Sequence, residues 1–377
     1  MMQKQLGAEQ IRREIIRLCQ AGFDSRTLRI ETMKQLRKAL PIDVSFFATA
    51  DPATLLFTDV IADDILAEAT PLFIENEFLQ DDVNKFTWLA RGTQPVGGLV
   101  QMTHHQLEHS RRYRDILAPL GLGDELRAAL MTHDVCWGFL CLHRDQSSPP
   151  FTPAEAAFLH RLTPHLAEGS RHALLLGAAM AAPFSDDAPG LLLLADDLSV
   201  AAMTPTAERL IADLAESDRL PVRGLPYAVY AAAARLQACE RDNEGASELP
   251  PKVRLRTASG QWLVLHASRP SGLNTEGHIA VIFEVARPVE IARLIVQAYA
   301  LSHRESEIVQ LVAQGQPTTQ IATTFHITSN TVQDHLKAIF DKVGVRSRRE
   351  LVGQLFAQQY QPRITAGHSL GADGWFT

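Results

Sequence analysis

The sequence is poor in cysteine. Its 377 residues include only four cysteines, Cys19, Cys136, Cys141 and Cys239, and their spacing fits neither a metal-binding motif nor a disulfide framework. Cys136 and Cys141 lie five residues apart on one predicted strand, so their side chains should point to opposite faces and cannot pair with each other. We therefore expect buried structural thiols rather than a redox pair, in a reducing compartment.

Long apolar runs are also missing. No stretch of 18 or more apolar residues free of charge occurs, which argues against a transmembrane helix. The first residues, MMQKQLGAEQIRREII, are amphipathic and charged, unlike a signal peptide. The sequence thus predicts a cytoplasmic protein without a membrane partner.

The motifs of common enzymes are absent as well. The sequence has no G-x-x-x-x-G-K-[ST] phosphate loop, no G-x-S-x-G nucleophile elbow and no H-E-x-x-H zinc motif. The first region does not begin with a strand followed by paired acids, as a phosphoacceptor receiver domain would. We expect no catalytic residues, no cofactor and no enzymatic activity.

Positive charge is scarce over the whole chain. The formal net charge is −7, which argues against a protein that coats DNA non-specifically. Between residues 300 and 361, however, six lysines and arginines outnumber five acids. Any positive surface is therefore local, and such modest charge predicts DNA binding that depends on dimerisation and salt.

Residues 301–356 carry the most specific pattern, four short amphipathic helices with a tight turn between the second and third. Ser302 and Glu305 have the spacing of a capping box. Gly315 suits a left-handed helix end, and Thr328 suits the N-cap of the third helix. A helix-turn-helix of this kind places one helix in the major groove of DNA.

The third helix has two faces. Its core face is predicted to hold Val332, Leu336, Ile339, Phe340 and Val343 at helical spacing. Amide and charged side chains lie on the opposite face, where Gln333 and Lys337 could reach base edges. Downstream basic residues should position the duplex by its phosphates. The predicted DNA-binding residues are Thr328, Ser329, Asn330, Thr331, Val332, Gln333, Asp334, Lys337, Lys342, Arg346, Arg348 and Arg349.

This segment resembles the C-terminal DNA-binding domain of the LuxR type. The matching residues are Leu301, Ser302, Arg304, Glu305, Leu311 to Ala313, Gly315, Ile321, Ala322, Ile327, Thr331, Val332, His335, Leu336, Ile339, Phe340, Lys342 to Val345 and Arg348. Two positions depart from the family. Gln333 stands where a lysine is common, and Asp334 adds an acid to the DNA-facing side, so the usual target sequence should not be carried over.

The first region, residues 8–181, reads as mixed helix and strand. We expect helices at 28–40 and 106–117, strands at 44–48 and 55–61, a hairpin of 126–131 with 136–143, and a long helix from Phe151 to about Met180. The order of elements resembles a GAF sensory domain. The carrying residues are Leu120 to Leu122, Trp137 to Leu140, Arg144 and Phe151 to Glu155.

A Pro- and Asp-containing break at 182–190 separates this region from a second one, residues 190–286. Strands are expected at 191–195 and 200–203, helices at 206–214 and 227–239, a hairpin of 252–258 with 261–267, and a last strand at 278–285. This pattern resembles a PAS domain, carried by Leu192 to Leu194, Ala207 to Leu210 and Gly260 to Leu263.

His104, His105 and His109 lie within six residues, and His105 and His109 share a face at i, i+4, a pair that could ligate a metal together with the nearby Glu108. The arginines that follow at 111, 112 and 114 disfavour a cation, so we expect a plain surface helix and no metal site.

The sequence therefore predicts a multidomain chain, with two α+β sensor-like domains followed by an all-α, four-helix helix-turn-helix domain. The expected domain bounds are 8–181 (GAF-like), 190–286 (PAS-like) and 289–361 (helix-turn-helix), followed by a disordered tail at 362–377. The predicted function is sequence-specific transcription regulation on double-stranded DNA by a homodimer. A small-molecule ligand in an N-terminal domain and RNA polymerase are further candidate partners. Two alternatives remain open: a signalling scaffold that uses the helical domain for protein contacts, and an N-terminal enzyme fused to this module.

Overall fold

The computed structural model describes residues 2–179, 188–217, 224–241, 249–272 and 277–353. The break at 182–190 and the tail at 362–377 lie largely or wholly outside these residues. The chain divides into two compact units. One spans 1–177 and 187–285 and holds both sheets; the other spans 178–186 and 286–377, and its elements within the described residues are helices.

The first sheet has five antiparallel strands in the order β2-β1-β5-β4-β3. They are β1 (Val44–Ala50), β2 (Phe57–Ala62), β3 (Val96–Gly98), β4 (Leu122–Thr132) and β5 (Val135–Asp145). The predicted hairpin is confirmed, because β4 and β5 pair through a turn at His133 and Asp134, both of which have positive φ.

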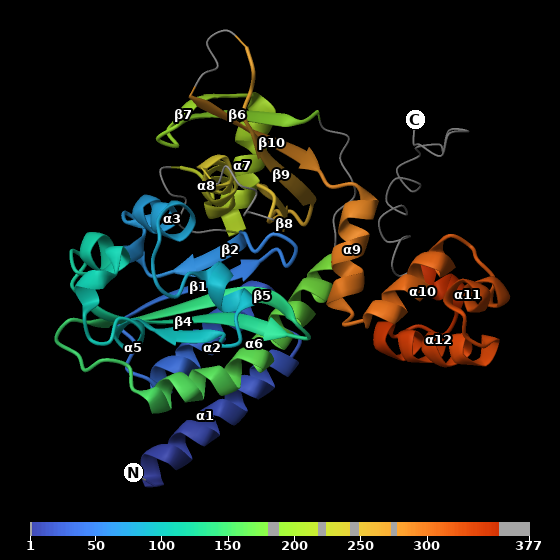
Figure 1. Ribbon diagram of the computed structural model, residues 1–377, viewed down its shortest axis with the longest axis horizontal. Helices are drawn as coiled ribbons and strands as arrows, with labels where there is room; N and C mark the ends of the chain where they lie inside the picture. The colour runs from blue at the N-terminus through green and yellow to red at the C-terminus, as the bar shows by residue number, and fades with distance from the viewer. Residues whose placement is uncertain (1, 180–187, 218–223, 242–248, 273–276, 354–377) are drawn as a thin grey trace. The chain divides into compact units, whose positions relative to one another are not determined.

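Helices cover both faces of this sheet (Figure 1). On one face lie α1 (Met2–Gln20), α2 (Ser25–Ala39) and α6 (Pro153–Ala179). On the other lies α3 (Thr70–Leu79), followed along the chain by α4 (Phe86–Arg91) and α5 (Leu99–Met102). The predicted long helix is confirmed as α6, and Thr152 forms reciprocal bonds with Glu155 at its start.

The predicted helix at 106–117 is wrong. The segment instead forms a 3-10 turn, η2 (Leu107–His109), and a π-helical turn, η3 (Tyr113–Leu117). Ser110 interrupts the helix, since its Oγ accepts from the Tyr113 backbone N–H. Arg112 is turned inward and fully buried, and its guanidinium bonds to Glu125 and Asn76. These buried ionic contacts outweigh the local preference for a regular helix.

The second sheet repeats the same strand order as β7-β6-β10-β9-β8, again antiparallel. Its strands are β6 (Gly190–Ala195), β7 (Val200–Met203), β8 (Lys252–Arg256), β9 (Trp262–Ser268) and β10 (His278–Val285). The helices α7 (Pro205–Ser217) and α8 (Tyr227–Arg241) lie between β7 and β8 in the chain. All the elements predicted here are present.

Helix α8 is the element that joins the two sheets. It packs against α3 and β2 of the first region and against β8, β9 and β10 of the second. Residues Tyr227 through Arg235 are all buried, so the helix shows no solvent face over more than two turns. The two sheets consequently share one hydrophobic core around α8.

The helical unit contains α9 (Pro288–Ala298), α10 (His303–Ala313), α11 (Thr318–Phe325), α12 (Ser329–Val343) and α13 (Arg348–Val352). Helix α9 buries Ile291, Leu294, Ile295 and Ala298, which lie on one face at helical spacing. The fold class predicted from the sequence is confirmed, with two sheet-containing α+β regions followed by a helical one. Among the described residues, no helix is both long and apolar enough to cross a membrane.

Candidate functional site

The helix-turn-helix is built by local caps. The Ser302 Oγ accepts from the Glu305 N–H at 3.2 Å, and the Glu305 carboxylate accepts from the Ser302 N–H at 2.6 Å. His326 adopts a left-handed conformation, φ 55°, which turns the chain from α11 into α12. Thr328 caps α12 by accepting from the Thr331 N–H at 3.1 Å. Gly344, also left-handed, ends α12.

Helix α12 has the two faces that its sequence predicts. Val332, Leu336, Ile339 and Val343 are buried, and Phe340 is half-buried. Asn330, Gln333, Asp334 and Lys337 are exposed on the opposite face. Amides and a lysine in this arrangement can bond base edges or phosphates.

Three of the predicted DNA-binding side chains have other roles inside this domain. Val332 is 0% exposed, so its side chain belongs to the core and cannot reach a base. The Lys342 ammonium lies 2.6 Å from the Glu305 carboxylate, a group that is itself buried. Arg348 donates to the Gln316 carbonyl at 3.0 Å and to the Thr318 hydroxyl at 3.2 Å, which ties α13 to the start of α11.

Among the predicted DNA-binding residues, the basic side chains that remain available to contact DNA are Lys337, Arg346 and Arg349. All three are exposed, and none has a side-chain partner within the described part of the chain. The Glu350 carboxylate, which could have neutralised Arg348, instead accepts from the Arg346 backbone N–H at 2.7 Å. The exposed side chains of Thr328, Ser329 and Asn330, with half-buried Thr331, complete the start of α12.

A second candidate site is a cavity in the unit that holds the sheets. It lies between the first sheet and α3, and Tyr227 of α8 closes one side. The Tyr227 hydroxyl is 3.0 Å from the Thr70 hydroxyl, and its ring meets Phe46 edge-on. Aromatic and aliphatic side chains form most of the wall, with a polar edge: Phe46, Phe57, Leu66, Thr70, Phe73, Ile74, Glu77, Phe86, Arg127, Cys141, His143 and Tyr227.

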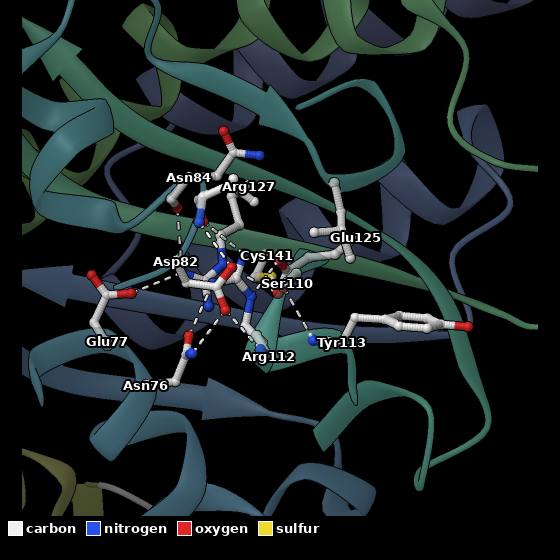
Figure 2. A network of polar contacts seen from close by, with 12 residues as sticks. Asn76, Glu77, Asp82, Asn84, Ser110, Arg112, Tyr113, Glu125, Arg127 and Cys141 are labelled. Carbon is white, nitrogen blue, oxygen red and sulfur yellow. Dashed lines mark hydrogen bonds and ion pairs between the residues drawn. The ribbon is translucent and has the colours of Figure 1, made fainter. Parts of the chain in front are cut away.

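The polar edge belongs to a buried ionic network, shown in Figure 2. Arg112 and Arg127 lie 2.7 and 3.1 Å from Glu125, and Arg127 also lies 2.8 Å from Glu77. All four side chains are at most 5% exposed. Burial disfavours the charge on Glu125, but the two guanidinium groups outweigh burial and hold the pKa of that carboxyl well below its usual range.

Glu125, Cys141 and His143 form the one group of metal-ligating types that comes together among the described residues. Their donor atoms are 3.2 to 3.4 Å apart. A cation there would compete with two guanidinium groups for one carboxylate. Burial, and then the charge of Glu125, also raise the pKa of the Cys141 thiol well above its usual range. We therefore assign these contacts to hydrogen bonding in the cavity wall.

The histidine cluster is not assembled into a site. His104 and His105 have positive φ, and His109 ends a 3-10 turn, so His105 and His109 do not share a helix face. The four cysteines are free. Burial raises the pKa of both Cys19 and Cys136 to about 12, which makes their thiols poor nucleophiles at neutral pH.

Comparison with known proteins agrees with this geometry. Residues 299–354 match the family model of bacterial regulatory proteins, luxR family, and residues 27–168 match the GAF domain. The spore germination protein GerE of Bacillus subtilis (strain 168) is 34% identical over 55 residues, 15% of this chain and 74% of that protein. The chain belongs to the luxR family of bacterial regulatory proteins.

A GAF domain/HD domain protein from Geobacter sulfurreducens is 19% identical and covers 42% of this chain and 98% of its own, with a TM-score of 0.31. SdiA in complex with octanoyl-rac-glycerol is 14% identical and covers 92% of this chain and 93% of its own, with a TM-score of 0.33.

Two features of this luxR-family chain escaped the sequence reasoning. The first is the ionic network, whose signal was three charged residues, Asp124, Glu125 and Arg127, within a strand that is otherwise mostly apolar. The second is the central place of α8, whose signal was the run YAVYAAAARL without a polar face. Charged side chains within an apolar strand and a helix without a polar face both have to be buried against another part of the chain.

Proposed function

We propose that this chain is a sequence-specific DNA-binding transcription regulator whose sheet-containing region senses a ligand or partner and controls dimerisation or DNA affinity. The observation that carries the proposal is α12, which offers exposed amide and basic side chains on one face and a continuous buried face on the other. Membership of the luxR family supports double-stranded DNA as the partner.

In this proposal the reading side chains are Asn330, Gln333 and Lys337, while Arg346 and Arg349 contact phosphates. Asp334 also lies on the exposed face and would repel phosphate, which limits non-specific binding. Since a DNA-binding regulator works where the chromosome is, the proposed place of action is the bacterial cytoplasm. RNA polymerase is a further proposed partner.

A homodimer is part of the proposal. One recognition helix contacts only a few base pairs, so two half-sites about 10 bp apart, roughly one helical turn, would supply the remaining affinity.

The proposed domains have the bounds 8–181, 190–286 and 289–361. The first two would act as one regulatory body, since α8 packs against both sheets.

The proposal is tested with the full chain by mapping its binding sites across the genome of its host. The best site is then measured as a duplex at several salt concentrations, with sedimentation of the free and bound protein. The expected result is a preferred sequence, a dimer on the duplex and an affinity that falls linearly on log–log axes with salt. An absence of any preferred sequence together with binding insensitive to salt would favour a scaffold that uses the helical unit for protein contacts.

A further inference from the structure

The side chain of Gln333 is bonded to the helix that precedes its own. Gln333 is exposed on α12, and its Nε2 donates to the Thr318 Oγ1 at 3.5 Å. Thr318 is the first residue of α11 and lies 15 residues earlier in the chain. The bond therefore bridges the two helices of the helix-turn-helix at its exposed face.

The Thr318 hydroxyl is itself held in place by Arg348. The Arg348 Nη2 donates to the same Oγ1 at 3.2 Å, and its Nη1 donates to the Gln316 carbonyl at 3.0 Å. A hydroxyl oxygen has two lone pairs, so it can accept from Arg348 and Gln333 together. Because the guanidinium is planar and its donors are fixed, its bond to the backbone at Gln316 also fixes the donor at Thr318.

The contact leaves the base-reading groups of Gln333 free. It engages one N–H of the carboxamide, and the Oε1 and the second N–H remain as the acceptor and donor that a base edge requires. An exposed glutamine samples several rotamers, and fixing one of them on a base costs conformational entropy. A contact that favours one rotamer before DNA arrives lowers this cost.

Gln333 is distinct in this respect from its neighbours on the exposed face. Asn330 and Lys337 share that face, and within the described ranges neither side chain has a hydrogen-bond partner. At 3.5 Å the Gln333 bond is long for an N–H···O contact, so it favours one rotamer without locking it. An effect of a few fold on base preference is therefore expected.

We propose that Thr318 is a positioning residue for sequence recognition, whose hydroxyl, held by Arg348, orients the Gln333 carboxamide toward one base pair. Thr318 acts through Gln333 and has no contact of its own with the base. This inference rests on the proposed function, and it deepens that function by naming a residue outside α12 that sets the base preference.

The test measures the affinity of the full chain for a randomised duplex library. Thr318→Val keeps the shape of the side chain and removes the hydroxyl, and should lower the preference at the Gln333-dependent base position about fivefold, the effect of one neutral hydrogen bond. Thr318→Ser keeps the hydroxyl and should retain the preference. Thr324→Val is the matched control, because the Thr324 hydroxyl donates to the Gln320 carbonyl within α11, and it should leave the preference unchanged.

A double substitution separates positioning from a direct contact with DNA. In the Gln333→Ala background, Thr318→Val should change the base preference no further, since the side chain that it positions is gone. The salt slope should be the same in all variants, because none of them removes a positive charge. Circular dichroism establishes that each variant folds.

Three results would overturn the inference. They are an unchanged preference in folded Thr318→Val, an equal loss on all sequences in that variant, and a further loss of preference when Thr318→Val is added to Gln333→Ala. In each of them the wild type still selects a sequence, so the proposed function stands. A wild type without any preferred sequence would instead refute the proposed function, and this inference with it.

Discussion

Arg348 connects the last described helix to the turn before α11 through the Gln316 carbonyl and the Thr318 hydroxyl. Arg348→Ala removes both bonds and leaves the carbonyl without its donor, so we expect the helical unit to lose about 1–3 kcal/mol of unfolding free energy. Urea unfolding followed by circular dichroism measures this loss. Arg349→Ala, the neighbouring exposed position, should change stability by less than about 0.5 kcal/mol. Equal effects of the two substitutions would contradict this role for Arg348.

The Glu305 carboxylate should make the helical unit sensitive to acid. Burial raises its pKa, but the bonds from Lys342 and the Ser302 N–H prevail, so its folded pKa lies below the ordinary value of 4.5. Its contribution is therefore complete above about pH 4.5 and is lost as pH falls through the lower, folded pKa. Glu305→Gln should unfold more readily at pH 7 and show a smaller further loss below pH 4.5. Parallel stability curves for the two proteins from pH 7 to 3 would be inconsistent with this.

At the scale of single residues, the sequence predicted the exposed face of α12 and its caps, but not the partners that Lys342 and Arg348 have within the domain. Asn330, Gln333 and Lys337 follow from helical spacing alone, which local sequence determines. Lys342 and Arg348 were predicted to contact phosphates because both are basic, and the structure adds that each bonds to an acceptor within the domain. Their acceptors, Glu305 and Gln316, lie more than 30 residues away in the chain, and a single sequence does not show that proximity.

At the scale of elements, α8 is tightly constrained by its neighbours. Ala232 is 0% exposed within a helix that contacts both sheets, so added volume cannot be accommodated by movement toward solvent. We expect Ala232→Leu to cost about 1–3 kcal/mol of unfolding free energy. Ala212→Leu on the exposed face of α7 is the matched control and should be nearly neutral. Thermal unfolding of both variants checks this, and tolerance at position 232 would show that α8 is not held between the sheets.

The elements that the sequence predicted well are those fixed by local rules. The β4–β5 hairpin follows from its turn, and α6 follows from its capping pair. The segment 106–117 was missed because its backbone follows the burial of Arg112 against Glu125, a tertiary interaction that overrides helix propensity. The cavity could not be foreseen either, since its wall combines strands, α3 and one residue of α8.

At the scale of the whole molecule, the two sheets should unfold together. Asp51 is 2% exposed and is bonded by Arg254 of β8 at 2.6 Å, which links the first region to the second. Arg254→Ala leaves that carboxylate buried without its cation, and we expect a loss of about 3 kcal/mol. Arg269→Ala breaks only half-exposed pairs with Asp196 and Glu240 and should cost at most about 1 kcal/mol. Calorimetry should show one transition for the sheets, shifted down as a whole in Arg254→Ala. A split of that transition in the wild type would count against a shared core.

The central claim is that α12 reads DNA sequence while the exposed arginines beyond it hold the phosphates. The most direct measurement is the affinity of full-length wild type, Gln333→Ala and Arg349→Ala for a randomised duplex library at two salt concentrations. Gln333→Ala should lose about 1–3 kcal/mol on the best sequence and relax the preference at one base position. Arg349→Ala should weaken all sequences alike and lower the salt slope by about one unit. An unchanged base preference in Gln333→Ala, with an altered one in Arg349→Ala, would contradict the account.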